Sequence, residues 1–192
     1  MFPEFQANFL EGYQKTVYYF DKGNTRFYML NSNYPGEEHL ISDTQINWIN
    51  SNMNSEKRYT FYFFHEPAYP TGAHVSSSLD VNKLQRDKLW GIIDRSPNPI
   101  VFCGHEHNYS RRHIDHNFNE TIAGQTFLFS QSIYQVTIGT FGAPVYLSYT
   151  DKKNVDVPPI PQYHFAVIDL NSDNILVTVY NLNGQIIDRF VQ

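Results

Sequence analysis

The chain of 192 residues has little charge and almost no cysteine: 17% of its residues are charged, and Cys103 is the sole cysteine. One cysteine forms neither an internal disulfide nor a CxxC metal clip, which excludes a disulfide-stapled scaffold and a zinc finger. The net charge is −5 without any block of Lys and Arg, which argues against nucleic acid and anionic membranes as partners. No apolar run approaches the roughly 18 residues of a membrane-spanning helix. The opening MFPEFQANFL lacks the basic start and apolar stretch of a signal peptide.

Apolar and aromatic residues are plentiful, at 41% and 16% of the chain. Such a composition lies far from that of disordered chains, so we expect a folded protein with a substantial core. The length fits one globular domain over residues 1–192.

The first part of the chain predicts alternating strands and helices. Strands are expected at 16–21, 26–30, 59–64 and 100–103, and helices at about 43–53 and 81–94. Lys22-Gly23-Asn24 is a hairpin signal, and Ser42 with Gln45 forms a capping box in front of the first helix. The strand at 59–64 is almost continuously apolar, which is typical of a strand that is covered on both faces.

After residue 120 the pattern changes to short strands without intervening helices. These are expected around 127 and at 133–138, 145–149, 165–170 and 175–180, with a final hairpin turn at Asn183-Gly184. A strand–helix part followed by an all-strand part predicts a layered α/β fold.

Three of the eight histidines follow predicted buried strands. His65 comes directly after the strand at 59–64, and His105 and His107 follow the strand at 100–103 after Gly104. Residues i and i+2 of an extended segment point the same way, so His105 and His107 are expected in one cavity. The ends of buried strands are where α/β folds build sites. A lone histidine here is usually an ordinary polar residue, but three in matching positions favour metal ligands.

Two motifs carry a resemblance to a known family. GHEHNYSR at 104–111 resembles the GHxHxYxR signature of calcineurin-like metallophosphoesterases, particularly their purple acid phosphatase branch. HEPAY at 65–69 resembles the HxPxY segment of that branch, and GTFGAP at 139–144 agrees with it. The resemblance runs from about Thr16 to the C-terminus, and it implies a layered β-sandwich flanked by helices, an αββα arrangement.

The resemblance also implies metal ligands. His65 and His105 would bind one ion, and His107 the other ion, of a dinuclear centre of zinc, iron or manganese. The family further requires Asp-x-His, Gly-Asp and Asn-His motifs upstream, and none occurs in this sequence. Three neutral imidazoles without bridging carboxylates are expected to hold at most one metal ion.

Three further residues have roles implied by the resemblance. His74 falls where the branch carries a histidine that contacts phosphate and protonates the leaving group. Read from the residues alone, His74 is equally a solvated loop histidine. Tyr109 and Arg111 match the tail of the signature and would line the substrate mouth, although Arg111 reads equally as a surface residue.

The absent motifs imply that the chain corresponds to the C-terminal part of a calcineurin-like phosphoesterase domain, incomplete at its N-terminal side. A fragment, a truncated product and one of two chains are all compatible with the sequence. The strand edges and apolar faces left open predict self-association or binding of a missing N-terminal half.

The leading hypothesis is a metal-dependent phosphoesterase, which hydrolyses a phosphomonoester or phosphodiester with a metal-bound hydroxide and is inactive as this isolated chain. One alternative is a degenerate, non-catalytic module of the same fold that serves in binding or assembly. Another is a single-zinc protein in which all three histidines converge on one ion. The branch that the chain resembles implies an extracytoplasmic location.

Overall fold

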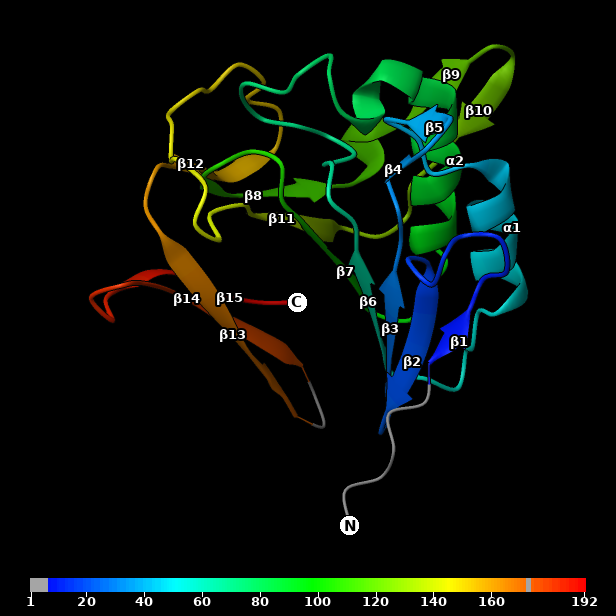
Figure 1. Cartoon of the computed structure of the whole chain (residues 1–192), viewed down its shortest axis with the longest axis horizontal. Helices are drawn as coiled ribbons and strands as arrows, with labels where there is room; N and C mark the ends of the chain where they lie inside the picture. Colours follow the sequence, from blue (N-terminus) through cyan, green and yellow to red (C-terminus); the bar gives the residue numbers. More distant parts are fainter. Residues whose placement is uncertain (1–6, 172–173) are drawn as a thin grey trace.

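The computed structural model describes residues 7–171 and 174–192, and its largest element is an eight-stranded mixed sheet (Figure 1). In spatial order its strands are β1 (Asn8–Phe9), β2 (Tyr18–Lys22), β3 (Thr25–Met29), β6 (Tyr59–Phe63), β7 (Pro99–Cys103), β11 (Ile133–Ile138), β8 (Tyr109–Ile114) and β12 (Val155–Ile160). The neighbours β3, β6, β7 and β11 are parallel. Their carboxyl ends therefore meet at one edge of the sheet.

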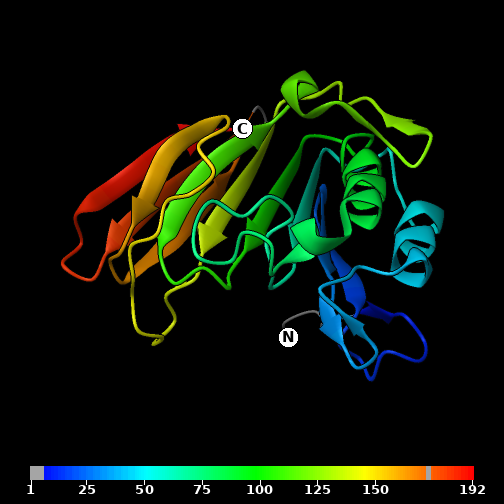
Figure 2. The same ribbon diagram turned by 90° about the horizontal axis from the view of Figure 1, so that it is seen from above.

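Helices cover one face of this sheet and a second sheet covers part of the other (Figure 2). The helices are α1 (Asp43–Ser51) and α2 (Lys83–Ile93), and the second, antiparallel sheet contains β13 (His164–Leu170), β14 (Ile175–Asn181) and β15 (Ile186–Val191). Smaller elements are β4 (Asn33–Tyr34), β5 (Glu37–Glu38), β9 (Glu120–Ile122), β10 (Gln125–Phe127) and the 3-10 turns η1 (Leu79–Asn82) and η2 (His116–Phe118). The predicted α/β fold of stacked layers flanked by helices is confirmed.

The central strands are buried on both faces, and successive side chains belong to different cores. Phe61 and Phe102 face the second sheet and share a cluster with Val177. Tyr62 and Val101 face the helices. Full burial of an apolar side chain contributes about 1.5–3 kcal/mol, so this two-sided packing fixes which way each residue of β6 and β7 points.

Both helices begin close to where the sequence predicts them. The Ser42 side chain accepts a hydrogen bond from the Gln45 amide, as expected of a capping box. The second helix starts at Lys83, because the preceding residues form η1 and Asn82 provides the cap. In the part of the chain that the structure describes, no helix has both the length and the apolar character needed to cross a membrane.

The predicted strand at 145–149 is wrong, because this segment is a loop. The Tyr146 amide donates to the His107 carbonyl at 3.3 Å, and the amide of Thr150, directly after the segment, donates to the Thr71 carbonyl at 2.8 Å, so the hydrogen bonds go to two separate segments and form no ladder. Leu147 is exposed, so the apolar pattern of the segment does not reflect a core-facing strand.

Three strands of the main sheet were not predicted, namely the two-residue β1 and the longer β8 and β12. The β8 segment contains Arg111 and Arg112, which do not look like residues of a buried strand. Arg112 is nevertheless buried, because its guanidinium donates to the Tyr69 and Pro70 carbonyls at 3.0 and 3.2 Å. The β12 segment contains two prolines, which an edge strand tolerates.

Candidate functional site: a histidine cluster at the strand ends

The backbone brings His65 and His105 together. Parallel pairing of β6 and β7 continues past both strands, since the Phe64 amide donates to the Phe102 carbonyl at 3.3 Å and the Gly104 amide to the His65 carbonyl at 2.9 Å. His105 then has a left-handed backbone with φ of 66°, which costs energy for a residue other than glycine. This turn directs the His105 side chain back toward His65.

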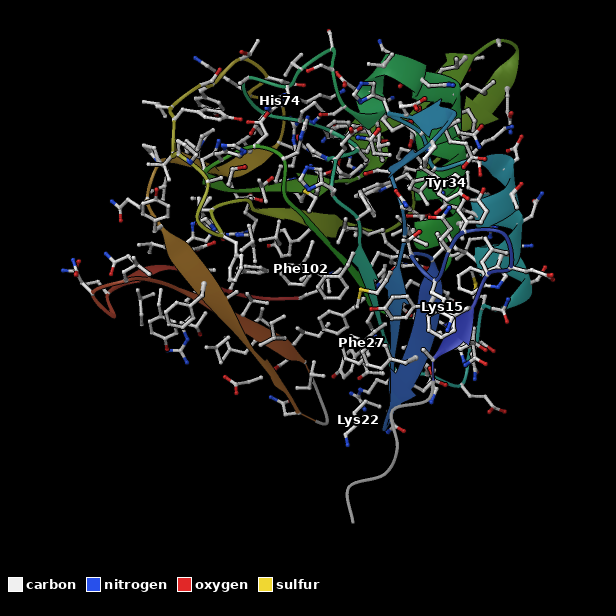
Figure 3. All side chains as sticks on the ribbon, viewed as in Figure 1. Lys15, Lys22, Phe27, Tyr34, His74 and Phe102 are labelled. Atoms are coloured by element: carbon white, nitrogen blue, oxygen red, sulfur yellow. The ribbon has the colours of Figure 1, made fainter. Side chains whose placement is uncertain are left out.

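Three imidazoles form a cluster at this edge. His105 Nδ1 lies 3.2 Å from His65 Nε2, and the His74 ring centroid lies 3.8 Å from that of His105. Figure 3 shows His74 on its loop beyond the carboxyl ends of the parallel strands. The structure therefore brings together three histidines that the sequence analysis singled out, His65, His74 and His105.

His105 is held in its neutral form. Burial lowers its pKa to about 4, and the neighbouring His74 and His65 rings act in the same direction. At neutral pH the imidazole is therefore uncharged, which is the form that binds metal ions.

The spacing of the pair fits one metal ion in part. Two nitrogens that each lie about 2.0–2.1 Å from a tetrahedral zinc ion are separated by roughly 3.3–3.4 Å, close to the 3.2 Å between His65 Nε2 and His105 Nδ1. Within residues 7–171 and 174–192, no group of three or more His, Cys, Asp or Glu side chains is arranged to hold a metal ion. The pair could therefore supply two of the four ligands of a tetrahedral ion, and the described residues do not complete the set.

His107 points to a different neighbourhood. Its Nδ1 lies 3.0 Å from the Pro144 carbonyl oxygen, and its ring packs 5.2 Å from the Tyr146 ring. The Tyr146 hydroxyl in turn donates to the His105 carbonyl at 3.4 Å. His107 thus adjoins the cluster through Tyr146, and its role as a ligand of a second metal ion stays a prediction.

A buried carboxylate that the sequence analysis missed fixes the loop of His74. Glu106, between His105 and His107 in the chain, is fully buried and accepts hydrogen bonds from the amides of Gly72 at 2.9 Å and His74 at 3.2 Å. These bonds join two segments more than thirty residues apart in sequence. No periodicity or spacing in the sequence marks this glutamate.

A second missed pair lies beside His65. Glu66 is buried, and both of its carboxylate oxygens lie 2.9 Å from Nδ1 of the half-exposed His39. His39 is near enough to contribute to the lowered pKa of His105. The only sequence signal was the position of Glu66 inside the HxPxY-like segment.

Tyr109 and Arg111 occupy the opposite side of the sheet from the helices. The Tyr109 hydroxyl donates to Asp188 Oδ2 at 2.5 Å, and Arg111 Nε donates to the same oxygen at 2.8 Å while its guanidinium lies over the Phe190 ring. Burial and the Asp188 charge raise the pKa of Tyr109. The pair therefore ties β8 to β15, and its predicted place at a substrate mouth is not tested by these contacts.

Comparison with protein families gives no match to any family model, and no curated protein matches the sequence. The fold, however, is similar to solved structures. Purple acid phosphatase PPD1 from yellow lupin (Lupinus luteus) seeds aligns with a TM-score of 0.70 and 16% identity over 95% of this chain and 33% of that chain. GAP50, described as the anchor in the inner membrane complex of Plasmodium, aligns with a TM-score of 0.62 and 13% identity, over 91% of this chain and 52% of that one.

PhoD aligns with a TM-score of 0.51 and 14% identity, over 90% of this chain and 44% of its own. The chain thus spans between a third and about half the length of these three proteins. The purple acid phosphatase and PhoD both have metallophosphoesterase-like folds. At these identities the likeness shows the fold alone, and this chain has a metallophosphoesterase-like fold.

Proposed function

We propose that this chain carries the histidine side of a metal-dependent phosphoesterase site, in the purple acid phosphatase-like branch of the calcineurin-like metallophosphoesterases. The observation that carries the proposal is the pair of imidazole nitrogens, His65 Nε2 and His105 Nδ1, 3.2 Å apart at the ends of β6 and β7. The likeness of the fold to a purple acid phosphatase and to PhoD supports it. Residues 1–192 would correspond to the C-terminal part of such a domain, with an extracytoplasmic location.

In this proposal His65 and His105 hold one zinc, iron or manganese ion. Such an ion, when bound, supplies a Lewis acid that offsets charge on phosphoryl oxygens and lowers the pKa of water. His74 contacts the phosphate group of the ester and gives a proton to the leaving oxygen, a role that requires a fixed loop. Glu106 fixes that loop through two backbone amides. His107 keeps its Nδ1 on the Pro144 carbonyl and would serve a second ion through Nε2, as metal-binding histidines commonly do.

Zinc binding to the purified chain tests the proposal. Isothermal titration should give a site of one ion per chain, and His65→Ala and His105→Ala should each weaken it by more than the roughly 10–100-fold typical of an outer-shell change. His116→Ala is the matched control, because this exposed histidine lies in η2. An equal loss in the control, or no zinc binding by the unaltered chain, would refute the proposed site.

A non-catalytic role in binding or assembly is the second candidate. Two observations favour it: GAP50, which is described as an anchor, shares the fold, and the described residues offer no carboxylate to complete the metal ligands of the histidine pair. The candidates differ in turnover. A phosphoesterase hydrolyses a phosphate ester once the ligand set is complete, whereas an assembly module binds its partner and leaves the ester intact.

A further inference from the structure

The second sheet has an open edge at β13. This strand pairs with β14 over all seven residues in continuous register, and no strand within residues 7–171 and 174–192 pairs with its other side. Two backbone amides with known partners show which amides of β13 face the open edge. The His164 amide donates to the Thr140 side chain, whereas the Asn171 amide bonds across the hairpin to the Asn174 carbonyl. Because amides alternate sides along a strand, those of Ala166 and Ile168 point toward the open edge.

The other edges of the two large sheets are protected against pairing, and β13 is not. The described part of β1 has two residues, β12 contains two prolines and shifts register twice, and β15 has a register shift and an adjacent Asp188-Arg189 pair. Proline, charge, brevity and bulges are the usual means of blunting a strand edge. The sequence of β13, HFAVIDL, has no proline and a single charged residue. Its edge is therefore well suited to accept another strand.

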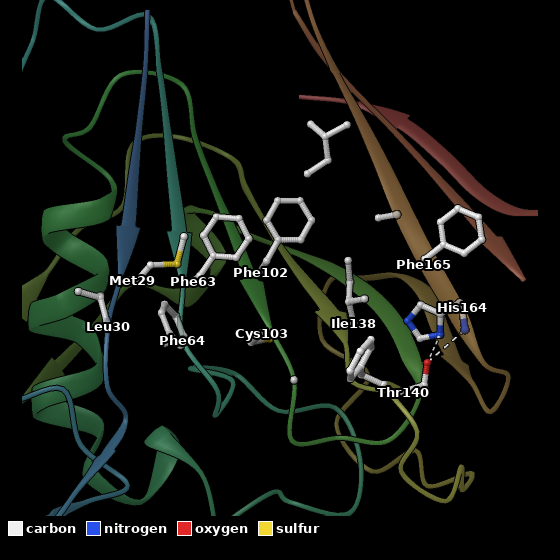
Figure 4. Close-up of a pocket in the computed structure, with 14 residues that line it drawn as sticks. Met29, Leu30, Phe63, Phe64, Phe102, Cys103, Ile138, Thr140, His164 and Phe165 are labelled. Atoms are coloured by element: carbon white, nitrogen blue, oxygen red, sulfur yellow. Dashed lines mark hydrogen bonds between the residues drawn. The ribbon is translucent and has the colours of Figure 1, made fainter. Parts of the chain in front are cut away.

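An apolar cavity runs along this edge. It has a volume of about 550 Å³ and lies between β13 and the ends of β3, β6 and β7 (Figure 4). Phe63 and Phe102 line it from the main sheet, and Ala166 and Ile168 line it from β13. Phe27, which packs against the same cluster as the second sheet, is half-buried, whereas Phe61 and Phe102 are buried. The second sheet therefore covers this apolar face incompletely at Phe27, which Figure 3 labels together with Phe102.

We propose that the open edge of β13 and this cavity form the docking site for one extended strand of a partner polypeptide, whose alternate side chains are apolar. Only a polypeptide offers both features that the site demands, namely backbone groups for the Ala166 and Ile168 amides and apolar side chains for the cavity. A lipid or a small apolar molecule fills the cavity but leaves the edge unpaired. In each of the three similar structures, about half or more of the chain lies outside the matched part. In those proteins the matched fold is therefore joined to additional polypeptide.

A second copy of the chain fits this site poorly. In an antiparallel pair of β13 strands, directly opposite residues lie on the same face of the sheet. The eight-stranded sheets of both copies would then lie on the same side of the joined β13 to β15 sheets. They would occupy the same volume, so the two copies would clash. The partner strand therefore comes from a polypeptide in which that strand is not already packed against a sheet of its own.

Nuclear magnetic resonance on the ¹⁵N-labelled full chain tests the docking site. The probe is a short synthetic peptide of alternating valine and threonine with a lysine at each end. We expect amide exchange at Ala166 and Ile168 to slow by about tenfold or more when the peptide binds, because each amide gains a ladder hydrogen bond. Exchange at Val167 should change little, since its amide already faces β14.

Two controls separate edge pairing from simple filling of the cavity. A peptide with N-methylated valines keeps the side chains but lacks the amides that face β13, and it should bind at least about tenfold more weakly. Ala166→Pro removes a donor from the open edge without touching the β13–β14 ladder and should have the same effect, whereas Val167→Thr on the outer face should not. If Ala166→Pro fails to fold, the methylated peptide still distinguishes edge pairing from filling of the cavity.

Three outcomes overturn the proposal. The first is unchanged exchange at Ala166 and Ile168 with millimolar peptide. The second is equal binding of the methylated peptide, which would make the cavity a site for apolar molecules only. The third is a dimer of the chain in which these two amides are already protected without peptide, since a second copy would then occupy the edge. None of these measurements depends on a metal ion or on hydrolysis, so the result is independent of the proposed function.

Discussion

Replacing Gly139 by alanine should destabilise the protein through a backbone collision next to the histidine cluster. A Cβ at Gly139 would lie 2.8 Å from the Glu106 carbonyl carbon and closer still to its oxygen. Ordinary contact begins at 3.4 Å, so the carbon must move by 3.4 − 2.8 = 0.6 Å and the oxygen by more. Backbone yields less easily than a flexible side chain, and overpacking of this kind costs about 1–3 kcal/mol. For a chain of this size that lowers the melting temperature by roughly 2–12 °C.

Displacement of the Glu106 backbone should also change the histidine cluster, because Glu106 lies between His105 and His107 in the chain and accepts a hydrogen bond from the His74 amide. We therefore expect Gly139→Ala to weaken zinc binding as well as stability, as measured by calorimetric titration and by thermal unfolding followed with circular dichroism.

Gly91→Ala is the matched control for this experiment. Gly91 lies in α2, and a Cβ there meets nothing within 4 Å. Alanine in a helix is favoured over glycine by about 0.5–1 kcal/mol, so the same substitution should raise the melting temperature. Opposite shifts for the two variants support the reasoning. If Gly139→Ala melts at or above the temperature of the unaltered chain and binds zinc normally, the close approach of the two backbones does not constrain the site.

Lowering the pH from 7 toward 4 should reduce stability in the absence of metal. The pKa of His105 is depressed to about 4 in the folded chain, so the unfolded chain takes up the proton first, near pH 6.5. The stability tied to this group is present above pH 6.5 and lost as the pH falls through 4, and His105→Asn should flatten that part of a urea-unfolding series. Asp188→Ala should cost about 1.5–3 kcal/mol in denaturant unfolding, because Tyr109 and Arg111 both lose a charged hydrogen-bond partner and Arg111 keeps only Asp156 at 3.5 Å, while zinc affinity stays unchanged. The purified chain with zinc, manganese or iron should not hydrolyse nitrophenyl phosphate above background, and turnover that His105→Ala abolishes would contradict this. In a longer protein that supplies carboxylate ligands, His107→Ala should depress hydrolysis by orders of magnitude, whereas His74→Ala should cost less than the about 10²–10⁴-fold value of a general acid for this easily displaced leaving group.

The features that could be predicted from the sequence are those with local physical causes. The turn at Asn183-Gly184 follows from the positive φ that Gly184 adopts, and the β6 strand follows from a run of residues that can be buried on both faces. The approach of His65 to His105 was predictable for a related reason, because each follows a buried strand and parallel strands end at one edge.

The features that could not be predicted depend on partners distant in sequence. Glu106 is buried only because Gly72 and His74 turn their amides toward it, and no local pattern encodes that meeting. The same applies to Arg112, whose burial in β8 requires carbonyls some forty residues away. Conversely, the apolar segment at 145–149 has the composition of a strand but lacks a neighbouring strand to pair with.

The Glu106 carboxylate also links two segments of the cluster whose thermal motions would otherwise be independent. The loop that carries His74 and the turn that carries His105 have separate covalent attachments to the sheet, yet both are tied to this one side chain. Their fluctuations on the picosecond to nanosecond timescale should therefore be correlated, so that the two rings drift together while their separation varies little. Hydrogen exchange at the Gly72 and His74 amides should accordingly rise in Glu106→Gln, which weakens this shared attachment.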